Sequence, residues 1–190
     1  TIPLADMEDI SNWYVKLLYS EIFSLEKDLN NFTEGSSSLG VNFTSGIHDH
    51  RYFYGDSFSD TYWENHDFLR FWAKSEKPAN MDAAILNGSA YSSLKPFNVN
   101  STGKYVMLDI KDWSKDDIVR ILFYNWDLGL DNKISIDDVS LCNLDLDSSS
   151  WNVKDSYQDI FSLSQETANP LSGNSSLKVD FTSGIDSYRY

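Results

Sequence analysis

The chain repeats part of itself after 138 residues. Residues 13–52 align without a gap to residues 151–190, and 21 of the 40 aligned residues are identical. A period of this length is too long for a solenoid unit and matches the size of one autonomous domain. The repeat therefore predicts one complete module at residues 1–143, a linker at residues 144–150 and the first strands of a second copy at residues 151–190.

The identical residues of the repeat alternate with residues that differ. In the segment 39–43 every second residue (Leu, Val, Phe) recurs in the segment 177–181, whereas the glycine and asparagine between them become lysine and aspartate. Successive side chains of a strand point to opposite faces of its sheet. The comparison of the two copies therefore predicts a strand with one packed face and one solvated face.

Alternation with a period of two recurs along the first copy. It predicts strands at residues 69–73, 105–110 and 119–126, the last with Val119, Ile121 and Phe123 on one face. Glycine, asparagine and aspartate separate these runs and are typical of turns. Many short strands separated by turns predict an all-β fold, an antiparallel β-sandwich or jelly roll.

The charge of the chain limits its partners. It contains 29 acidic and 15 basic residues, a formal net charge of −14, and shows no basic stripe. Nucleic acid is therefore not expected as a partner, because phosphate binding needs clustered cations. No apolar run reaches the length of a membrane-spanning helix, so membrane insertion is not expected either. Cys142 is the single cysteine, which excludes an intrachain disulfide.

Three segments give the chain a resemblance to a known type of module. They are residues 6–8 before Trp13, the Gly-Ser-Ser-Ser-Leu-Gly-Val run at 35–41, and the pair of segments 104–113 and 136–141. In this order and spacing they resemble a calcium-containing jelly-roll carbohydrate-binding module, of the galactose-binding-domain-like type. The resemblance spans nearly all of residues 4–143, and it implies a non-catalytic, extracellular or cell-surface protein.

The resemblance also implies a structural calcium ion that joins the first and last strands. The candidate ligands are Glu8 near the N-terminus and one of Asp137 and Asp138 in the predicted strand at residues 134–141. Calcium takes six to eight hard oxygen ligands, which carboxylates and backbone carbonyls supply. The alternative is that the two aspartates only form a solvated entry to the strand.

Aromatic side chains on a sheet face bind the sugar in modules of this type. Aromatic patches on a solvated face usually mark interaction sites. The residues that fit this chemistry are the outward-facing Arg70, Trp72, Tyr105, Arg120, Tyr124 and Trp126. The alternatives are a second buried layer or a contact between modules.

The sequence leaves three functions open. The first is binding of a neutral polysaccharide by a secreted or cell-surface protein. The second is a structural repeat of an extracellular filament or adhesive stalk, in which residues 151–190 share strands with neighbouring copies of the same chain. The third is an enzyme that uses Glu64 and Asp67, and it is disfavoured because no supporting motif accompanies this acidic pair.

Overall fold

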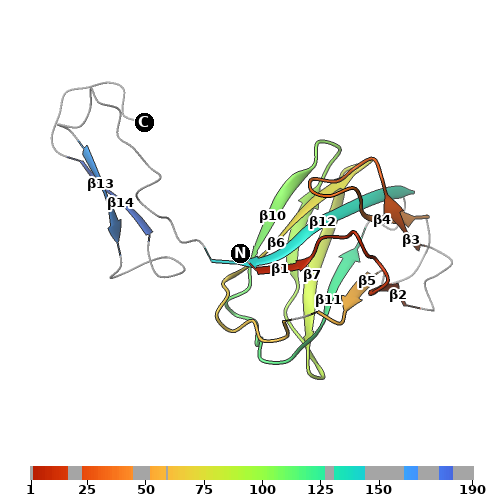
Figure 1. The fold of residues 1–190 in the computed structure, drawn as a ribbon, viewed down its shortest axis with the longest axis horizontal. Helices are drawn as coiled ribbons and strands as arrows, with labels where there is room; N and C mark the ends of the chain where they lie inside the picture. Colours follow the sequence, from red (N-terminus) through yellow and green to blue (C-terminus); the bar gives the residue numbers. More distant parts are fainter. Residues whose placement is uncertain are drawn as a thin grey trace. The chain divides into compact units, whose positions relative to one another are not determined.

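The computed structural model describes residues 2–16, 23–44, 52–58, 60–126, 131–143, 161–166 and 176–181. The chain divides into two compact units, Thr1–Cys142 and Asn143–Tyr190 (Figure 1). The predicted linker at 144–150 lies outside the described residues. None of the described residues is helical, and so no helix among them is long and apolar enough to cross a membrane.

The first unit contains two antiparallel sheets. In the first, which we call the β12 sheet, the order is β10 (Lys104–Asp109), β6 (Phe68–Ser75), β12 (Asn132–Cys142), β4 (Ser38–Phe43) and β3 (Phe23–Asp28), and β1 (Ile2–Ala5) also pairs with β12. In the second, the β11 sheet, the order is β2 (Trp13–Val15), β5 (Tyr52–Asp56), β11 (Ile118–Asn125), β7 (Ala79–Asn87) and β8 (Ala90–Tyr91), and β9 (Lys95–Val99) also pairs with β7. The predicted all-β sandwich is therefore confirmed.

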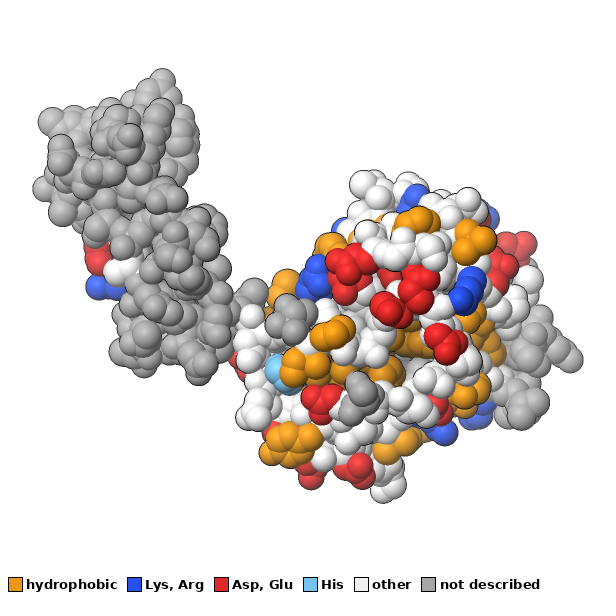
Figure 2. Space-filling view, in the orientation of Figure 1, with side chains coloured by type: hydrophobic (Ala, Val, Ile, Leu, Met, Phe, Trp, Pro, Cys, Tyr) orange, Lys and Arg blue, Asp and Glu red, His pale blue; other side chains and the backbone are white. Residues whose placement is uncertain are grey.

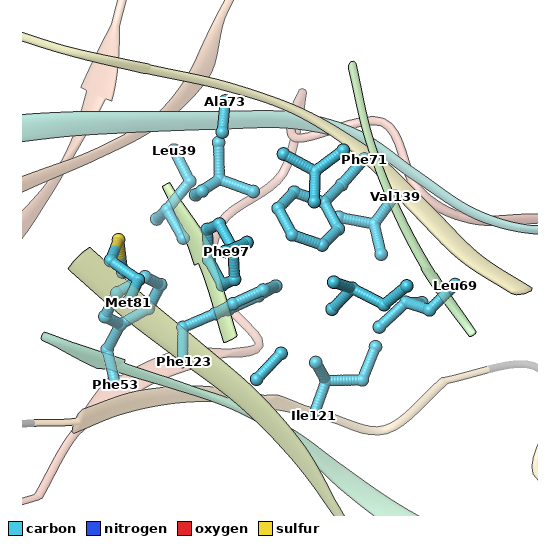
Figure 3. Packing of buried hydrophobic residues seen from close by; sticks show 14 of the residues in the cluster. Leu39, Phe53, Leu69, Phe71, Ala73, Met81, Phe97, Ile121, Phe123 and Val139 are labelled. Atoms are coloured by element: carbon cyan, nitrogen blue, oxygen red, sulfur yellow. The ribbon is translucent and has the colours of Figure 1, made fainter. Parts of the chain in front are cut away.

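The core forms where the alternating apolar faces of the two sheets meet (Figure 3). Leu69, Phe71 and Ala73 of β6 are fully buried, as the alternation predicts. Phe123 of β11 lies across from them, and its ring centroid is 5.0 Å from that of Phe71 and 5.4 Å from that of Phe53. Because two interlocked faces exclude water here, burial of apolar area stabilises the sandwich.

The alternation assigns the start of β11 to the wrong face. The register between β11 and β7 shifts between Ile118 and Arg120, where a β-bulge interrupts the ladder. A bulge adds one residue to a strand and so reverses the facing of the residues before it. Ile118 is consequently buried, whereas Val119 is 37% exposed.

The second unit contains a hairpin that matches one in the first. β13 (Phe161–Glu166) pairs antiparallel with β14 (Ser176–Phe181), and Phe161 is opposite Phe181. In the first unit β3 pairs with β4 in the same way, with Phe23 opposite Phe43. The two hairpins therefore have the same backbone register, residue for residue at the offset of the sequence repeat.

An ionic cluster around buried Asp28 fastens β3 to the rest of the β12 sheet. Lys133 of β12 reaches across β4 and places its Nζ 2.9 Å from Glu26 Oε1 and 3.2 Å from Asp28 Oδ2 of β3. Asp28 is only 1% exposed, and its carboxylate also accepts hydrogen bonds from Asn31 Nδ2 at 2.9 Å and Ser135 Oγ at 2.8 Å. We call Lys133, Glu26 and Asp28 the three-strand clamp.

The clamp predicts a pH dependence of stability. Burial acts to raise the pKa of Asp28, but the hydrogen bonds from Asn31, the Asn30 amide and Ser135 outweigh it and hold that pKa well below its ordinary value. A carboxyl with a lowered pKa stabilises the fold above its unfolded pKa of about 3.9 and loses this contribution as the pH falls further. Asp28→Asn should lower the free energy of unfolding at neutral pH by about 1–3 kcal/mol and flatten its decline in acid.

Urea unfolding at a series of acidic and neutral pH values measures both effects. Glu76→Gln, at an exposed position, is the control and should leave the unmodified profile unchanged. If the free energy of unfolding declined equally steeply in acid for Asp28→Asn and the unmodified chain, the lowered pKa of Asp28 would be contradicted.

Candidate functional site

A row of aromatic side chains crosses the outer face of the β11 sheet. Strand pairing builds it, because Tyr14 of β2 lies opposite Tyr54 of β5, and Tyr52 of β5 lies opposite Tyr124 of β11. Trp126 follows β11 directly and continues the row. We call Tyr14, Tyr52, Tyr54, Tyr124 and Trp126 the tyrosine face.

The rings of the tyrosine face contact one another in sequence. Ring centroids are 5.6 Å apart for Tyr14 and Tyr54, 6.2 Å for Tyr54 and Tyr52, and 5.2 Å for Tyr52 and Tyr124. The rings of Tyr124 and Trp126 are 5.7 Å apart and nearly parallel, with 6° between their planes. The two ends of the row are the most open, with Tyr14 40% and Trp126 39% exposed.

The outward residue beneath these rings is apolar and covered. Leu122 points to the same face as Arg120 and Tyr124 yet is only 1% exposed. Its register partners are Tyr54 on β5 and Ala84 on β7. The rings of the tyrosine face therefore cover Leu122 and form an aromatic layer on the outside of the sheet.

Polar groups accompany the aromatic rings. The Arg120 guanidinium lies over the Tyr54 ring, 4.5 Å from its centroid. The Arg120 Nε is buried and has no hydrogen-bond partner among the described residues. Asp82 lies on β7, the neighbour of β11 opposite β5, and its carboxylate accepts a hydrogen bond from the indole Nε1 of Trp126. A cationic donor and a carboxylate thus flank the rings, which is the combination that recognises hydroxyl groups beside an apolar surface.

A surface hollow adjoins the β8 edge of this sheet. Its lining residues are Asn87, Ala90, Tyr91, Ser92, Ser93, Asp112, Trp113 and Ser114, and its volume is about 390 Å³. Tyr91 is 60% exposed, and its register partner Leu86 in turn pairs with Arg120. The hollow therefore lies next to the tyrosine face, at the side where Arg120 stands.

The sandwich divides the six predicted binding residues between its two outer faces. Arg120, Tyr124 and Trp126 lie on the β11 sheet within or beside the tyrosine face. Arg70 and Trp72 of β6 and Tyr105 of β10 lie together on the β12 sheet, where Trp72 is opposite Tyr105. The structure therefore makes two sets of three from what the sequence presents as one set.

The set on the β12 sheet is engaged in contacts of its own. The Arg70 guanidinium stacks 3.7 Å from the Tyr105 ring centroid and forms an ion pair of 2.8 Å with Asp138. Tyr105 donates its hydroxyl hydrogen to the same carboxylate at 2.9 Å. Trp72 lies against Gly103, where an added Cβ would come within 2.6 Å of the indole. These contacts favour a structural role for this set.

Three tyrosines and Asp82 join the site without having been predicted. Tyr14, Tyr52 and Tyr54 each alternate with a buried residue in the sequences Trp-Tyr-Val and Tyr-Phe-Tyr. This period of two was the available signal for their outward position. Their proximity to Tyr124 depends on which strands pair, and that information is not local in the sequence.

The predicted calcium ligands divide in a similar way. Glu8 accepts hydrogen bonds from Ser36 Oγ at 2.7 Å and the Ser37 amide at 3.1 Å. Fully buried Asp137 accepts from the Thr33 amide at 2.7 Å and the Glu34 amide at 3.3 Å. Both carboxylates therefore hold the turn at residues 33–37. The carboxylate of Asp138 is instead bound to Arg70 and Tyr105.

Backbone geometry explains this division. Asp138 has a positive φ of 47° within a register shift of β12 against β6, so consecutive aspartates reach different neighbours. At the turn, Gly35 has φ of 65°, and a Cβ there would lie 2.0 Å from Glu8 Oε1. The hydrogen bond from the Ser36 amide is the largest cause that lowers the pKa of Glu8. The described residues contain no group of three or more His, Cys, Asp and Glu side chains able to hold a metal.

The acidic pair of the enzyme alternative belongs to a folded loop. Glu64 Oε1 accepts a hydrogen bond of 2.8 Å from the Lys115 amide, and Lys115 Nζ donates to the His66 carbonyl at 2.8 Å. Trp63 is fully buried beside them and donates to the Asp60 carbonyl. Glu64 therefore fixes the segment that precedes β11.

Acidic side chains are spread over the surface of the first unit. In the view of Figure 2 they lie interspersed with hydrophobic side chains rather than in one block. This distribution agrees with the formal net charge of −14. Such a surface repels polyanions at long range.

The β-sandwich is similar to solved structures of carbohydrate-binding modules and of an agarase. A family 11 carbohydrate-binding module from Clostridium thermocellum, in complex with a β-1,3-1,4-mixed-linked tetrasaccharide, matches with a TM-score of 0.54 and 17% identity over 74% of this chain and 94% of that chain. A family 28 module specific for non-crystalline cellulose matches with a TM-score of 0.51 and 13% identity, over 74% and 93%. An exo-β-agarase matches with 0.56 and 13% identity, over 75% of this chain and 25% of the enzyme.

No protein-family model matches the chain, and no curated protein is significantly similar to it in sequence. At these identities the structural likenesses establish the fold. They show that the chain shares the β-sandwich fold of these modules.

The packing of Tyr124 predicts a loss of stability in alkali. Burial, followed by the neighbouring phenols of Tyr52 and Tyr91, raises the pKa of Tyr124 to about 12. An unfolded tyrosine has a pKa of about 10, so the folded state is progressively disfavoured as the pH rises from about 10 towards 12. Over this range the free energy of unfolding of Tyr124→Phe should therefore fall by about 1–2 kcal/mol less than that of the unmodified chain, a figure that allows for solvent screening.

Thermal melts at pH values on both sides of this range measure the difference. Tyr62→Phe, at a position where the side chain is 55% exposed, is the matched control and should follow the unmodified chain. Identical alkaline profiles for Tyr124→Phe and the unmodified chain would show that Tyr124 is not shielded.

Proposed function

We propose that this chain is a non-catalytic carbohydrate-binding module of a secreted or cell-surface protein, and that it binds a neutral polysaccharide on the tyrosine face. The observation that carries the proposal is the continuous row of five rings on the outside of the β11 sheet, with the Arg120 guanidinium over the Tyr54 ring. Exposed aromatic surface is unfavourably hydrated, and a partner that covers the row removes this free-energy cost.

The chemistry of the face suits a sugar chain. A flat aromatic ring packs against the apolar C–H face of a pyranose, and charged or amide groups bond the hydroxyls around its rim. Here the rings of Tyr52, Tyr124 and Trp126 supply the platform, and Arg120 and Asp82 supply a donor and an acceptor. The net negative charge favours a neutral chain over an acidic one.

The structural likenesses support the same class of ligand. The similar family 11 module was solved in complex with a β-1,3-1,4-mixed-linked tetrasaccharide, and the similar family 28 module is described as specific for non-crystalline cellulose. Soluble β-glucans are therefore the first ligands to test, followed by mannans, xylans and agarose.

Calorimetry and affinity electrophoresis on these polysaccharides test the proposal. Trp126→Ala and Tyr124→Ala should each weaken binding about tenfold or more, as expected for a buried aromatic anchor. Trp72→Ala on the opposite sheet is the matched control, and its affinity should be unchanged. Absence of binding to every polysaccharide would refute the function, and equal losses for Trp72→Ala and Trp126→Ala would refute the site.

We also propose a structural calcium ion at the turn of residues 33–37. Glu8 and Asp137 both contact this turn, and the Ser36 and Ser37 hydroxyls and the Met7 carbonyl lie beside Glu8. These are hard oxygens, the donor type that calcium takes. Glu8 and Asp137 would hold the ion, which would tie the N-terminal segment to β12.

Thermal melts with calcium and with a chelator test the metal. A ligand that binds only the folded state stabilises it by about 2.7 kcal/mol at 100 times its Kd, so calcium should raise the melting temperature by several degrees. Glu8→Gln and Asp137→Asn should abolish the rise, whereas Asp138→Asn should retain it. Equal melting temperatures in calcium and chelator would contradict the proposal.

A second candidate function is a structural repeat of an extracellular filament that shares strands between subunits. The identical registers of the β3–β4 and β13–β14 hairpins favour it, because a hairpin of one copy presents the backbone pattern of the other. Sedimentation velocity over a wide concentration range distinguishes the two functions. Growth of oligomers with concentration supports strand sharing, and a concentration-independent monomer contradicts it.

A further inference from the structure

The outward face of the β11 sheet continues from Arg120 to the hollow at the β8 edge. Arg120 lies opposite Leu86 of β7, and Leu86 in turn lies opposite Tyr91 of β8. Residues opposite each other in antiparallel strands project to the same face of their sheet. Neighbouring strands are about 4.8 Å apart, so about 10 Å separates the backbone at Arg120 from the backbone at Tyr91. Arg120 also lies over the ring of Tyr54, and it therefore connects the tyrosine face with the hollow.

The aromatic row runs in a different direction from this connection. From Tyr54 the rings continue through Tyr52 and Tyr124 to Trp126. Tyr124 is four residues beyond Arg120 on β11, a distance of about 13 Å along a strand. The outer surface of the sheet is therefore forked where Tyr54 and Arg120 meet. One arm of the fork is the aromatic row that ends at Trp126, and the other arm leads to the hollow.

Hydrogen bonds hold the walls of the hollow in place. Asn87, at the end of β7, donates from Nδ2 to Asp116 Oδ1 at 2.7 Å and accepts a hydrogen bond of 2.7 Å from the Asp117 amide. Trp113 is buried, and its indole Nε1 donates to Ser93 Oγ at 3.1 Å. Both contacts join the chain around β8 to the segment between β10 and β11. Because the hollow is already formed, a ligand that enters it orders little of the protein.

The lining of the hollow suits one neutral sugar ring. Tyr91 is largely exposed and offers an aromatic ring, and three serine hydroxyls lie around it. Asp112 pairs with Lys95 at 2.6 Å and accepts from Ser93 Oγ at 3.3 Å, but a carboxylate has about four acceptor positions and keeps some for sugar hydroxyls. The volume of about 390 Å³ lies near the lower end of the range of about 300–1,000 Å³ for small-molecule sites. A single ring fits this space better than several consecutive sugars.

We propose that the hollow binds a short side branch of the polysaccharide whose main chain lies on the tyrosine face. The inference rests on the proposed function, and it makes a branched neutral polysaccharide the preferred ligand. A linear chain along the aromatic row does not reach the hollow, whereas a branch from a sugar beside Arg120 does. The carboxylates of Asp112 and Asp116 disfavour a branch that ends in an acidic sugar.

Matched polysaccharides with and without branches test the proposal on the full chain. One pair is a xyloglucan and linear hydroxyethyl cellulose, and the other is a galactomannan before and after removal of its galactose branches by α-galactosidase. The chain should bind the branched member of at least one pair about fivefold or more tightly than the linear member, because the branch adds contacts in the hollow. Calorimetry and affinity electrophoresis measure this ratio. Equal or weaker binding of the branched member in both pairs would overturn the proposal.

Variants of exposed residues assign the preference to the hollow. Tyr91→Ala should reduce the ratio of the two affinities to about one, because it removes the ring at the mouth of the hollow. Leu94→Ala is the matched control, since Leu94 is also exposed but does not line the hollow, and it should keep the full ratio. Trp126→Ala should weaken binding of both members of a pair alike. An undiminished ratio in Tyr91→Ala would overturn the assignment of the branch to the hollow.

The same measurements separate this inference from the proposed function. Binding of the linear polymers without a preference for the branched ones refutes the branch site alone and leaves the tyrosine face as a glycan site. Absence of binding to every polymer refutes the proposed function, and the branch site with it.

Discussion

Strand β12 is the element on which the β12 sheet depends, because it is hydrogen-bonded along both edges. One edge pairs with β6, while the other pairs with β4 through its N-terminal half and with β1 through its C-terminal half. A single strand from the end of the first unit thus joins segments from its start and its middle (Figure 1). The clamp lysine and the carboxylate of Asp137 extend this connection to β3 and to the turn of residues 33–37.

The sandwich architecture determines which outward residues can act together. Each strand has one outer face, and the two sheets turn those faces in opposite directions. Arg70, Trp72 and Tyr105 therefore form a group separate from Arg120, Tyr124 and Trp126. Contacts within each group then distinguish them, because Arg70 is neutralised by Asp138 while the Arg120 Nε has no hydrogen-bond partner among the described residues.

The sequence predicts the fold class well because alternation is a local signal. It identifies the inward residues Leu69, Phe71 and Phe123 and the outward positions of Tyr124 and Trp126. It misplaces Val119, because a bulge depends on the partner strand as well as on the strand itself. It also leaves open whether Asp137 or Asp138 faces the turn of residues 33–37, because the positive φ of Asp138 is not visible in the sequence. Contacts between neighbouring strands, such as that of Tyr52 with Tyr124, depend on the pairing of segments far apart in the chain. Alternation within one strand does not predict them.

The mutual packing of the tyrosine face has a thermodynamic consequence. A free tyrosine or tryptophan loses rotamer freedom when a ligand immobilises it, and this entropy loss weakens binding. Here each ring already contacts its neighbour, and Trp126 is further held by its hydrogen bond to Asp82. Most of the ordering therefore occurs during folding, so a ligand on this face would remove little further rotamer freedom.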